Sequence, residues 1–124
     1  MCVLVLGASG FIGSQIARAA LAAGHTVRAF CRPHRSQIGL ASLPVEIAIG
    51  DLEEPASLTR AMAGCAAVVH AAGYYPTRPL RCAEHLARAR RRIEHVLAAA
   101  RQAGVQRLIY TSSISTIGPL PAGR

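Results

Sequence analysis

A turn built on three glycines near the amino terminus could bind a phosphate group. Residues 7–13 read G-A-S-G-F-I-G, with glycines at the first, fourth and seventh positions. In such a turn the first glycine permits a tight bend and the second lets a pyrophosphate approach the backbone, while the third lets a helix pack closely on a strand. Backbone N–H groups and the positive end of the helix dipole then face the phosphates. A strand–helix turn that merely happens to be rich in glycine is the alternative.

A group of hydroxyl side chains near the other end of the chain could contact a bound ligand. Thr111 ends the run Q-R-L-I-Y-T, which is typical of a strand, and Ser112 and Ser113 follow it. Doubly wound sheets bind their ligands at the carboxyl ends of strands. Hydroxyls at a strand end can instead satisfy the neighbouring backbone, so both roles stay open.

The elements that must position these groups alternate between strand and helix. Short apolar runs predict strands at residues 2–6, 26–31, 45–49, 66–71 and 106–111. Helical spacing of apolar residues predicts a helix that Gly24 ends, a short one from Pro55 to Met62, and a long one that Gly104 stops. Residues 32–44 are expected to form a loop. This rhythm predicts an α/β fold, a Rossmann-type doubly wound parallel sheet in the order 3-2-1-4-5, as one domain over residues 1–124.

The long helix carries an apolar stripe beside a group of arginines. Leu86, Ala89, Ile93, Val96, Leu97 and Ala100 form the stripe. The formal net charge is +8, and eight of the 14 arginines lie between Arg78 and Arg107, so the charge is local. Arg88, Arg90, Arg91 and Arg92 flank the stripe with no interleaved aromatics for base stacking. We therefore expect a solvated or subunit-facing surface and no nucleic-acid partner.

Cysteine spacing and hydropathy exclude several other classes of protein. Cys2, Cys31, Cys65 and Cys82 show neither C-x-x-C spacing nor a histidine at ligand spacing, which indicates reduced thiols, most of them in the core, and no metal. Glycines interrupt the apolar amino terminus, and no uninterrupted apolar run reaches 18 residues. Neither a signal peptide nor a membrane partner is expected.

Four segments together resemble one known family. They are G-A-S-G-F-I-G, G-D-L at residues 50–52, V-V-H-A-A-G at 68–73, and A-G-V-Q-R-L-I-Y-T-S-S at 103–113. The chain resembles the extended branch of the short-chain dehydrogenase/reductase superfamily, in particular NAD-dependent epimerase/dehydratases, dihydroflavonol-reductase-like proteins and hopanoid-associated sugar epimerases. The resemblance implies an NAD(P)-dependent oxidoreductase or epimerase/dehydratase. Such a protein transfers hydride at a carbinol or carbonyl carbon of a sugar-nucleotide-like, flavonoid-like or steroid-like small molecule. A cytoplasmic protein that dimerises through the long helix is expected.

The resemblance also implies roles for individual residues. Asp51 would lie beside the adenine, although from its position it could instead cap the helix that starts near Pro55. Ser113 would hydrogen-bond the reacting oxygen of the substrate, with Ser112 and Ser115 as stand-ins, and His70 is expected to be a packed strand residue. The implied cofactor-binding set is Gly7, Ser9, Gly10, Phe11, Ile12, Gly13, Arg32, Asp51, Leu52, Ala71, Ala72 and Gly73.

Two departures from the family pattern bear on catalysis. Ala89 takes the place of an asparagine that supports the catalytic loop in the family. The family base, a tyrosine with a lysine four residues later, is absent because the sequence contains no lysine. We therefore expect the amino-terminal part of a longer enzyme, inactive by itself. A non-catalytic dinucleotide-binding module is the alternative.

The end of the second predicted strand indicates which cofactor is preferred. Proteins that use NAD place a carboxylate there to hold the ribose hydroxyls, whereas no carboxylate lies between His25 and Glu46. Arg32 could meet a 2′-phosphate with paired, charge-assisted hydrogen bonds, and dihydroflavonol-reductase-like proteins carry an arginine at the matching place. The sequence thus predicts a preference for NADP over NAD. Arg32 as an exposed loop residue in a site that takes either cofactor is the alternative.

Overall fold

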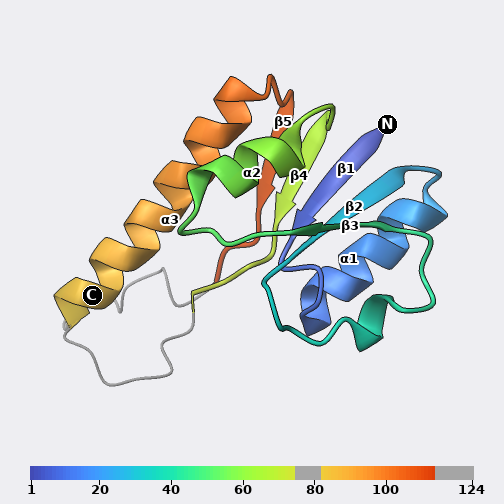
Figure 1. The fold of residues 1–124 in the computed structure, drawn as a ribbon, viewed down its shortest axis with the longest axis horizontal. Coiled ribbons are helices and arrows are strands. Elements are labelled where there is room, and N and C mark those ends of the chain that lie inside the picture. Colours follow the sequence, from blue (N-terminus) through green and yellow to red (C-terminus); the bar gives the residue numbers. More distant parts are fainter. Residues whose placement is uncertain (75–81, 114–124) are drawn as a thin grey trace, which may run out of the picture.

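A five-stranded parallel sheet forms the centre of the protein. The computed structural model describes residues 1–74 and 82–113. Their strands lie side by side in the order β3-β2-β1-β4-β5, and every neighbouring pair is parallel (Figure 1). The predicted fold class and strand order are therefore confirmed. The strands are β1 (Cys2–Leu6), β2 (Thr26–Cys31), β3 (Glu46–Ile49), β4 (Ala67–His70) and β5 (Arg107–Tyr110).

Helices cover both faces of the sheet, because alternate side chains of each strand point to opposite faces. Leu4 and Leu6 of β1 lie in one core cluster, with residues of the two later helices, whereas Val3 and Val5 lie in a second cluster against the first helix. Figure 1 shows α1 on one side and α2 with α3 on the other. The helices are α1 (Phe11–Ala22), α2 (Pro55–Met62) and α3 (Cys82–Gln102), with a 3₁₀ turn, η1 (Ile38–Leu40).

The prediction of an apolar stripe along α3 is wrong in part. Val96 and Ala100 are buried as predicted, but the side chains of Leu86 and Leu97 are 69% and 44% exposed. Ala99, which the pattern omitted, is buried instead. Val96, Ala99 and Ala100 pack into the core with residues of α2, whereas the described residues leave Leu86 and Leu97 partly uncovered.

The segment expected to be an irregular loop between β2 and β3 contains the turn η1. Leu40 of this turn is only 2% exposed and belongs to the core cluster on the α1 face. The turn therefore covers the sheet where α1 does not. Within the described residues, no helix is long and apolar enough to cross a membrane.

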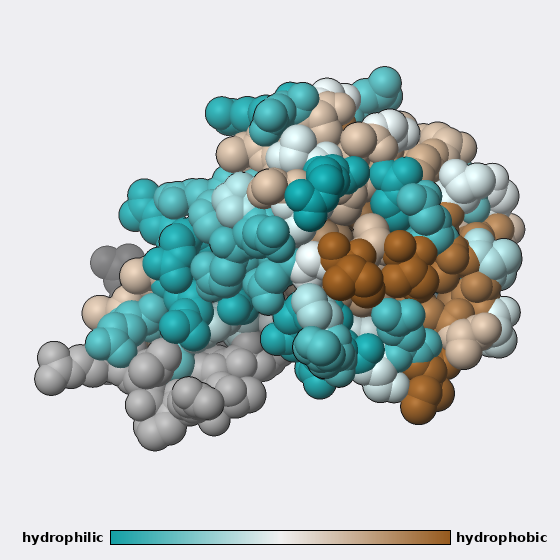
Figure 2. Space-filling view, viewed as in Figure 1, coloured by the Kyte–Doolittle hydropathy of each residue, from teal (hydrophilic) through white to brown (hydrophobic). Residues whose placement is uncertain are grey.

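Both edges of the sheet expose apolar side chains. On β3, Ile47 and Ile49 are 38% and 49% exposed, and Figure 2 shows hydrophobic side chains gathered over this strand and the turn before it. On β5, Ile109 and Tyr110 are 47% and 54% exposed. Within residues 1–74 and 82–113, each edge strand pairs with a neighbour on one side only.

Candidate functional site

The glycine turn joins β1 to α1 and lies against the segment that follows β4. Gly7 has a φ of +83°, a conformation that side chains disfavour. A Cβ atom at Gly7 would lie 2.9 Å from both Cα and N of Ala72. Two segments predicted separately as parts of one site, residues 7–13 and 71–73, are therefore in contact.

The other two glycines of the turn differ in what surrounds them. A Cβ at Gly13 would overlap the carbonyl of Gly7 and lie 2.9 Å from Cα of Ala8, so helix and strand pack as closely as the spacing predicted. At Gly10 a Cβ would approach only the carbonyl oxygen of Gly7, at 3.3 Å. The backbone at Gly10 thus faces space that the described residues leave empty.

The amino end of α1 is open to a ligand. Gly10 is the N-cap residue, and no described side chain caps this end or places a carboxylate in its first turn. Phe11 and Ile12 are 85% and 57% exposed, so they line the rim of the turn rather than the core. The first N–H groups of a helix lack partners within the helix, which leaves donors and a positive dipole end for an anion.

Ser9 connects the glycine turn to the end of β2. It lies beside the thiol of Cys31, and the backbone N–H of Gly7 in the same turn donates to the carbonyl of Phe30 in β2 at 3.3 Å. Burial raises the pKa of Cys31, although the hydrogen bonds to the side chain and backbone of Ser9 act in the opposite direction. The carboxyl ends of β1 and β2 are therefore joined beside the candidate phosphate site.

Arg32 immediately follows β2 at the same edge of the sheet. Its carbonyl accepts a hydrogen bond from the backbone N–H of Arg35 at 3.3 Å, and His34 between them has a φ of +59°. The guanidinium of Arg32 is exposed and has no hydrogen-bond or ion-pair partner among residues 1–74 and 82–113. It is free to bind an anion.

Asp51 stabilises a turn after β3 rather than the start of α2. Its Oδ1 accepts a hydrogen bond from the N–H of Glu53 at 2.9 Å, while the N-cap of α2 is Glu54. The alternative in which Asp51 caps this helix is therefore wrong. Ser57, which the sequence reasoning missed, accepts a hydrogen bond from the N–H of Asp51 at 3.2 Å. A Cβ at Gly50 would lie 2.7 Å from the ring of Phe30, so only glycine fits here.

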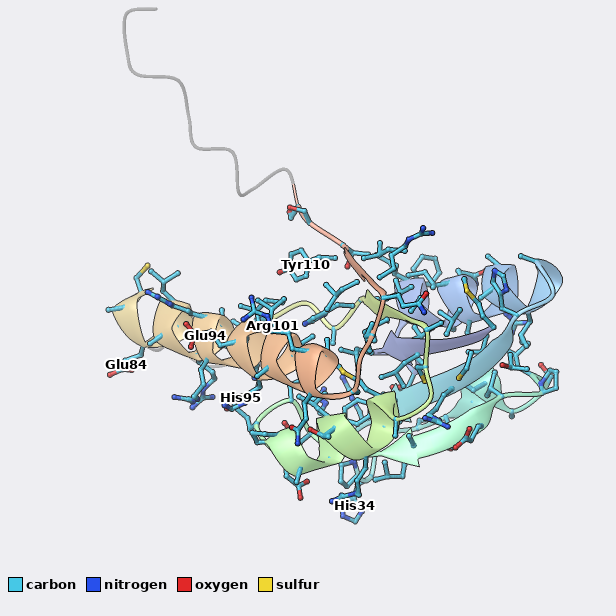
Figure 3. All side chains as sticks on the ribbon, turned by 90° about the horizontal axis from the view of Figure 1, so that it is seen from above. His34, Glu84, Glu94, His95, Arg101 and Tyr110 are labelled. Carbon is cyan, nitrogen blue, oxygen red and sulfur yellow. The ribbon has the colours of Figure 1, made fainter. Side chains whose placement is uncertain are left out.

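Leu52 contributes to the core instead of an open site. Its side chain is 7% exposed and packs with residues of β1, α2 and α3. Its carbonyl oxygen accepts a hydrogen bond from Nδ1 of His95 at 2.8 Å, and Figure 3 shows His95 extending from α3 toward this segment. Because its side chain is in the core, Leu52 could contact a cofactor only through its backbone atoms.

Glu53 links the same segment to α3 through two ion pairs. Its carboxylate lies 2.8 Å from Nε of Arg92 and 3.1 Å from Nε of Arg91. Burial opposes ionisation, but hydrogen bonds from Arg92 and Arg91 outweigh it and lower the pKa of Glu53. The expectation of a solvated arginine face is therefore wrong for Arg92, whose side chain is only 23% exposed.

Tyr74, next to the predicted site residue Gly73, joins this group. Its hydroxyl lies 2.8 Å from Nδ1 of His85, and the guanidinium carbon of Arg92 lies 5.1 Å from the centre of its ring. Nothing in the sequence pattern indicated this cluster, because its members come from two segments with no common spacing. Arg92 thus stabilises the segments on both sides of the candidate site.

The hydroxyl residues predicted at the carboxyl end of β5 lie beside the end of β4. His70 is 4% exposed, stacks edge-on against Tyr110 with ring centroids 5.1 Å apart, and has a pKa lowered by burial. It is a packed strand residue, as predicted. Thr111 donates from its backbone N–H and from Oγ1 to the carbonyl of His70, at 3.1 and 2.8 Å.

The hydroxyl of Thr111 therefore hydrogen-bonds to the neighbouring backbone, which is one of the two roles that the sequence left open. Ser112 and Ser113 are exposed beyond β5. Ser115 lies outside the described residues.

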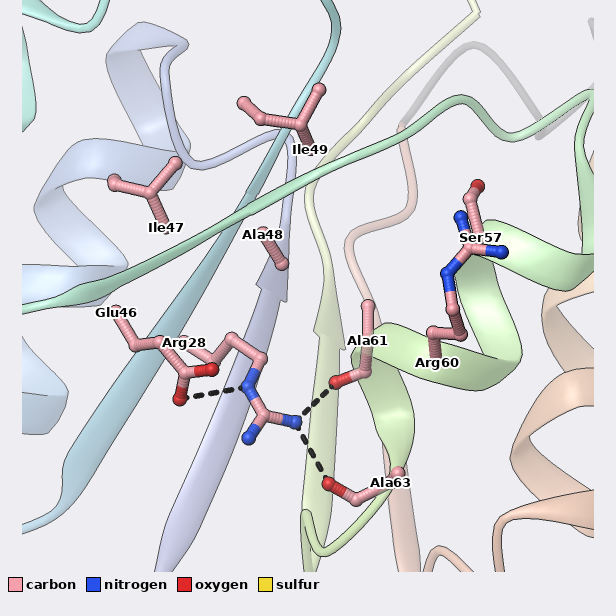
Figure 4. A pocket seen from close by; sticks show the side chains of 9 residues that line it. All are labelled: Arg28, Glu46, Ile47, Ala48, Ile49, Ser57, Arg60, Ala61 and Ala63. Atoms are coloured by element: carbon pink, nitrogen blue, oxygen red, sulfur yellow. Dashed lines mark hydrogen bonds and ion pairs between the residues drawn. The ribbon is translucent and has the colours of Figure 1, made fainter.

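An open pocket of about 330 Å³ lies elsewhere, between edge strand β3 and α2 (Figure 4). Arg28 dominates it, pairing with Glu46 at 2.9 Å and donating to the carbonyls of Ala61 and Ala63 at 2.7 and 2.8 Å. None of the predicted site residues lines this pocket. Because protein groups already occupy the guanidinium, we assign the pocket a structural role. Within the described ranges, no group of three or more His, Cys, Asp or Glu could hold a metal ion.

Comparisons with known proteins agree with this geometry. Residues 7–122 match the model of a family described as NAD(P)H-binding. A Synechocystis protein provisionally named as a dihydroflavonol 4-reductase is 34% identical over 120 residues, which cover 94% of this chain and 34% of that protein.

Two solved structures extend the comparison. A nucleoside-diphosphate-sugar epimerase from Pseudomonas aeruginosa is 31% identical, with a TM-score of 0.81 over 100% of this chain and 37% of its own. A short-chain dehydrogenase/reductase superfamily protein from Agrobacterium tumefaciens, solved with bound NAD, is 28% identical with a TM-score of 0.71 over 91% of this chain and 33% of its own. The chain thus spans about a third of the length of the relatives it matches.

Proposed function

The chain belongs to the NAD(P)H-binding family, and from this premise we propose that it binds NADP at the turn of residues 7–13, as part of a protein that transfers hydride. Its relatives include a protein provisionally named as a reductase, a nucleoside-diphosphate-sugar epimerase and a short-chain dehydrogenase/reductase superfamily protein. The bound nicotinamide would supply the hydride acceptor or donor. The residues of this chain hold the dinucleotide and present one hydroxyl to the substrate.

One observation carries the proposal: the contact of Gly7 with Ala72 at the point where the strand order changes direction. The chain runs from β1 to β2 on one side and places β4 on the other side of β1. Doubly wound sheets bind ligands in the crevice at such a switch point. The open end of α1 and the space above Gly10 lie at this position, which suits a pyrophosphate.

Arg32 supports the preference for NADP. Its guanidinium has no partner in the described part of the chain and follows β2 directly, where a 2′-phosphate on the adenosine ribose would lie. No carboxylate between Thr26 and Val45 opposes such a group. Asp51 is retained as the residue beside the adenine, held in place by the turn that its own side chain stabilises.

Ser113 is the proposed donor of a hydrogen bond to the reacting oxygen of the substrate. It follows β5 at the carboxyl edge, beside the end of β4 that carries Ala71, Ala72 and Gly73. The proposed substrate is a small molecule with a carbinol or carbonyl carbon, of the sugar-nucleotide, flavonoid or steroid kind. Because this chain has no lysine, we propose that it has no turnover by itself.

A module that binds the dinucleotide without chemistry is the second candidate. Ala89 favours it, because an alanine in α3 cannot provide the amide that supports the catalytic loop in the family. A Tyr-x-x-x-Lys pair encoded downstream of Arg124 would favour the enzyme. In that longer protein we propose a homodimer through α3, whose exposed Leu86 and Leu97 could be covered by a second subunit.

Competition with fragments of the cofactor tests the proposed binding mode. NADPH fluorescence would be followed as 2′,5′-ADP, 5′-AMP or nicotinamide mononucleotide is added to the complex. The proposal expects 2′,5′-ADP to displace NADPH at concentrations about 10-fold or more below those of 5′-AMP. Equal displacement by the two adenosine fragments would contradict the role of Arg32, and no binding of NADPH at all would contradict the proposed function.

A further inference from the structure

Two cysteines that are distant in sequence lie in contact at the amino edge of the sheet. The Sγ atoms of Cys2 and Cys65 are 3.2 Å apart, although 63 positions separate the residues. Cys2 begins β1, and Cys65 lies two residues before β4, the neighbouring strand. The backbone N–H of Ala66 donates to the carbonyl of Cys2 at 3.0 Å, so the sheet itself holds the two thiols together.

The two thiols differ in access to solvent. Cys65 is 4% exposed, whereas Cys2 is partly exposed. Burial and the neighbouring Cys2 raise the pKa of the Cys65 thiol to about 12, although the positive charge of Arg28 acts against this rise. A reagent in solution therefore reaches Cys2 first, and Cys65 is the thiol that can react with the product.

Arg28 brings a positive charge into contact with this pair. Its Nη1 lies 3.4 Å from Sγ of Cys65, and its Nε pairs with Glu46 at 2.9 Å. Nη1 also donates to the carbonyls of Ala61 and Ala63 at the end of α2, so the guanidinium is fixed in place. A positive charge fixed beside a pair of thiols stabilises negative charge on sulfur during exchange.

We propose that Cys2 and Cys65 are a redox-active pair, which hydrogen peroxide or an organic hydroperoxide closes to an intramolecular disulfide. The Cys2 thiolate attacks the peroxide and becomes a sulfenic acid, with release of hydroxide or alkoxide. The Cys65 sulfur then attacks the Cys2 sulfur, a disulfide bond forms, and water leaves with the Cys65 proton. Two thiols lose two electrons in total, and the peroxide is reduced.

The geometry permits closure without rearrangement of the fold. A disulfide has an S–S distance of about 2.05 Å, so the sulfurs approach by about 1 Å, which side-chain rotation can supply. The other two cysteines do not compete. Cys31 is buried in the core cluster on the opposite face of the sheet, and Cys82 begins α3 in an exposed position. The bond forms at the edge opposite the turn of residues 7–13, so closure leaves the candidate cofactor site in place.

Peptide mapping of the whole chain tests this inference. A Cys82→Ser variant, which lacks the exposed thiol and so avoids links between chains, is treated with hydrogen peroxide, unfolded, alkylated and digested with trypsin without reduction. The expected product is the peptide of residues 1–18 joined to the peptide that begins after Arg60, two hydrogens lighter than the separate pair. Three free thiols fall to one, and Tm rises by roughly 5–15 °C because the bond closes a long loop in the unfolded chain.

A second variant, Cys82→Ser with Cys65→Ser, provides the matched control. It should show no cross-link and no rise in Tm, and should accumulate sulfenic acid at Cys2, which a dimedone-type reagent detects. Cys82→Ser with Cys2→Ser replaces it if the substitution at the buried position prevents folding. A lack of cross-link at peroxide levels that oxidise Cys82 in the parent chain would overturn the proposal, as would a link to Cys31 in preference to Cys65.

Discussion

Arg92 of α3 lies 2.8 Å from the carboxylate of Glu53, and this ion pair joins the long helix to the turn that precedes α2. The same turn contains Asp51, the residue proposed to lie beside the adenine. Arg91 pairs with the second carboxylate oxygen at 3.1 Å. The position of a candidate binding segment therefore depends on charges 38 and 39 residues further along the chain.

Substitution Glu53→Gln should lower the free energy of unfolding by about 0.5–1 kcal/mol at pH 7, because the pair is partly exposed. The folded-state pKa of Glu53 is lowered, so its contribution is present above the unfolded pKa of about 4.3 and lost as pH falls through the folded value. Urea unfolding at pH 7 and below pH 4 measures the difference. Glu54→Gln, at an exposed neighbour that forms no ion pair with any described residue, is the control. A difference between Glu53→Gln and the parent that persists unchanged below pH 4 would contradict this account.

The part of the site that could be predicted from sequence depends on local backbone geometry. The spacing of Gly7, Gly10 and Gly13 allows few arrangements, because a bend, a close approach and a helix must follow within seven residues. Gly7 accordingly has a positive φ, and Gly13 packs against the carbonyl of Gly7. Strand order followed from the alternation of elements and the preference for right-handed crossovers.

The part that could not be predicted depends on contacts between distant elements. Glu53 reads as a favourable charge at the start of a helix, and only the packing of α2 on α3 shows that it pairs with Arg92. Leu52 reads as a site residue within G-D-L, yet its side chain completes the core. Side-chain direction at such positions is set by tertiary packing, which spacing does not encode.

The preference for NADP should be lost when the charge at Arg32 is reversed. Charge-assisted hydrogen bonds to the 2′-phosphate are worth roughly 1.5–3 kcal/mol, or about 10- to 150-fold in affinity. We expect the parent to bind NADP more tightly than NAD by this factor, and Arg32→Asp to lose the difference. Calorimetric titration of both cofactors measures it, with Arg35→Asp as a matched charge change. The preference would be wrong if the parent bound both cofactors equally, or if Arg32→Asp left NADP binding intact.

The chain by itself should show no reductase or epimerase turnover. General acid–base assistance contributes roughly 100- to 10,000-fold to such reactions, and the residue pair that provides it in the family is absent from this sequence. NADPH absorbance can be followed with carbonyl and sugar-nucleotide substrates at high protein concentration. Turnover that scales with purified protein and is lost in Ser113→Ala would contradict this prediction. It would show that this chain supplies the chemistry without the tyrosine and lysine of the family.

The protein should self-associate through the open edge at β5. Ile109 and Tyr110 expose apolar surface on β5, which pairs with β4 on one side and with no described strand on the other. Light scattering across a concentration series should show a rising mean mass for the parent and a smaller rise for Ile109→Glu. Ile38→Glu, at an exposed position on η1, makes the same change far from β5. A parent that stays monomeric at high concentration, or equal effects of the two variants, would count against association through β5.

The most direct test of the central claim is calorimetric titration of NADP into the parent and into Gly10→Val. A Cβ at Gly10 meets only the carbonyl oxygen of Gly7, at 3.3 Å, so the variant should fold while its side chain fills the space proposed for the pyrophosphate. Gly39→Ala is the matched control, because a Cβ there makes only ordinary contacts with Ser14, at 3.5 Å or more. We predict that the parent and Gly39→Ala bind NADP with similar affinity and that Gly10→Val does not bind it measurably. Binding by a folded Gly10→Val as tight as that of the parent would show that the turn of residues 7–13 is not the cofactor site.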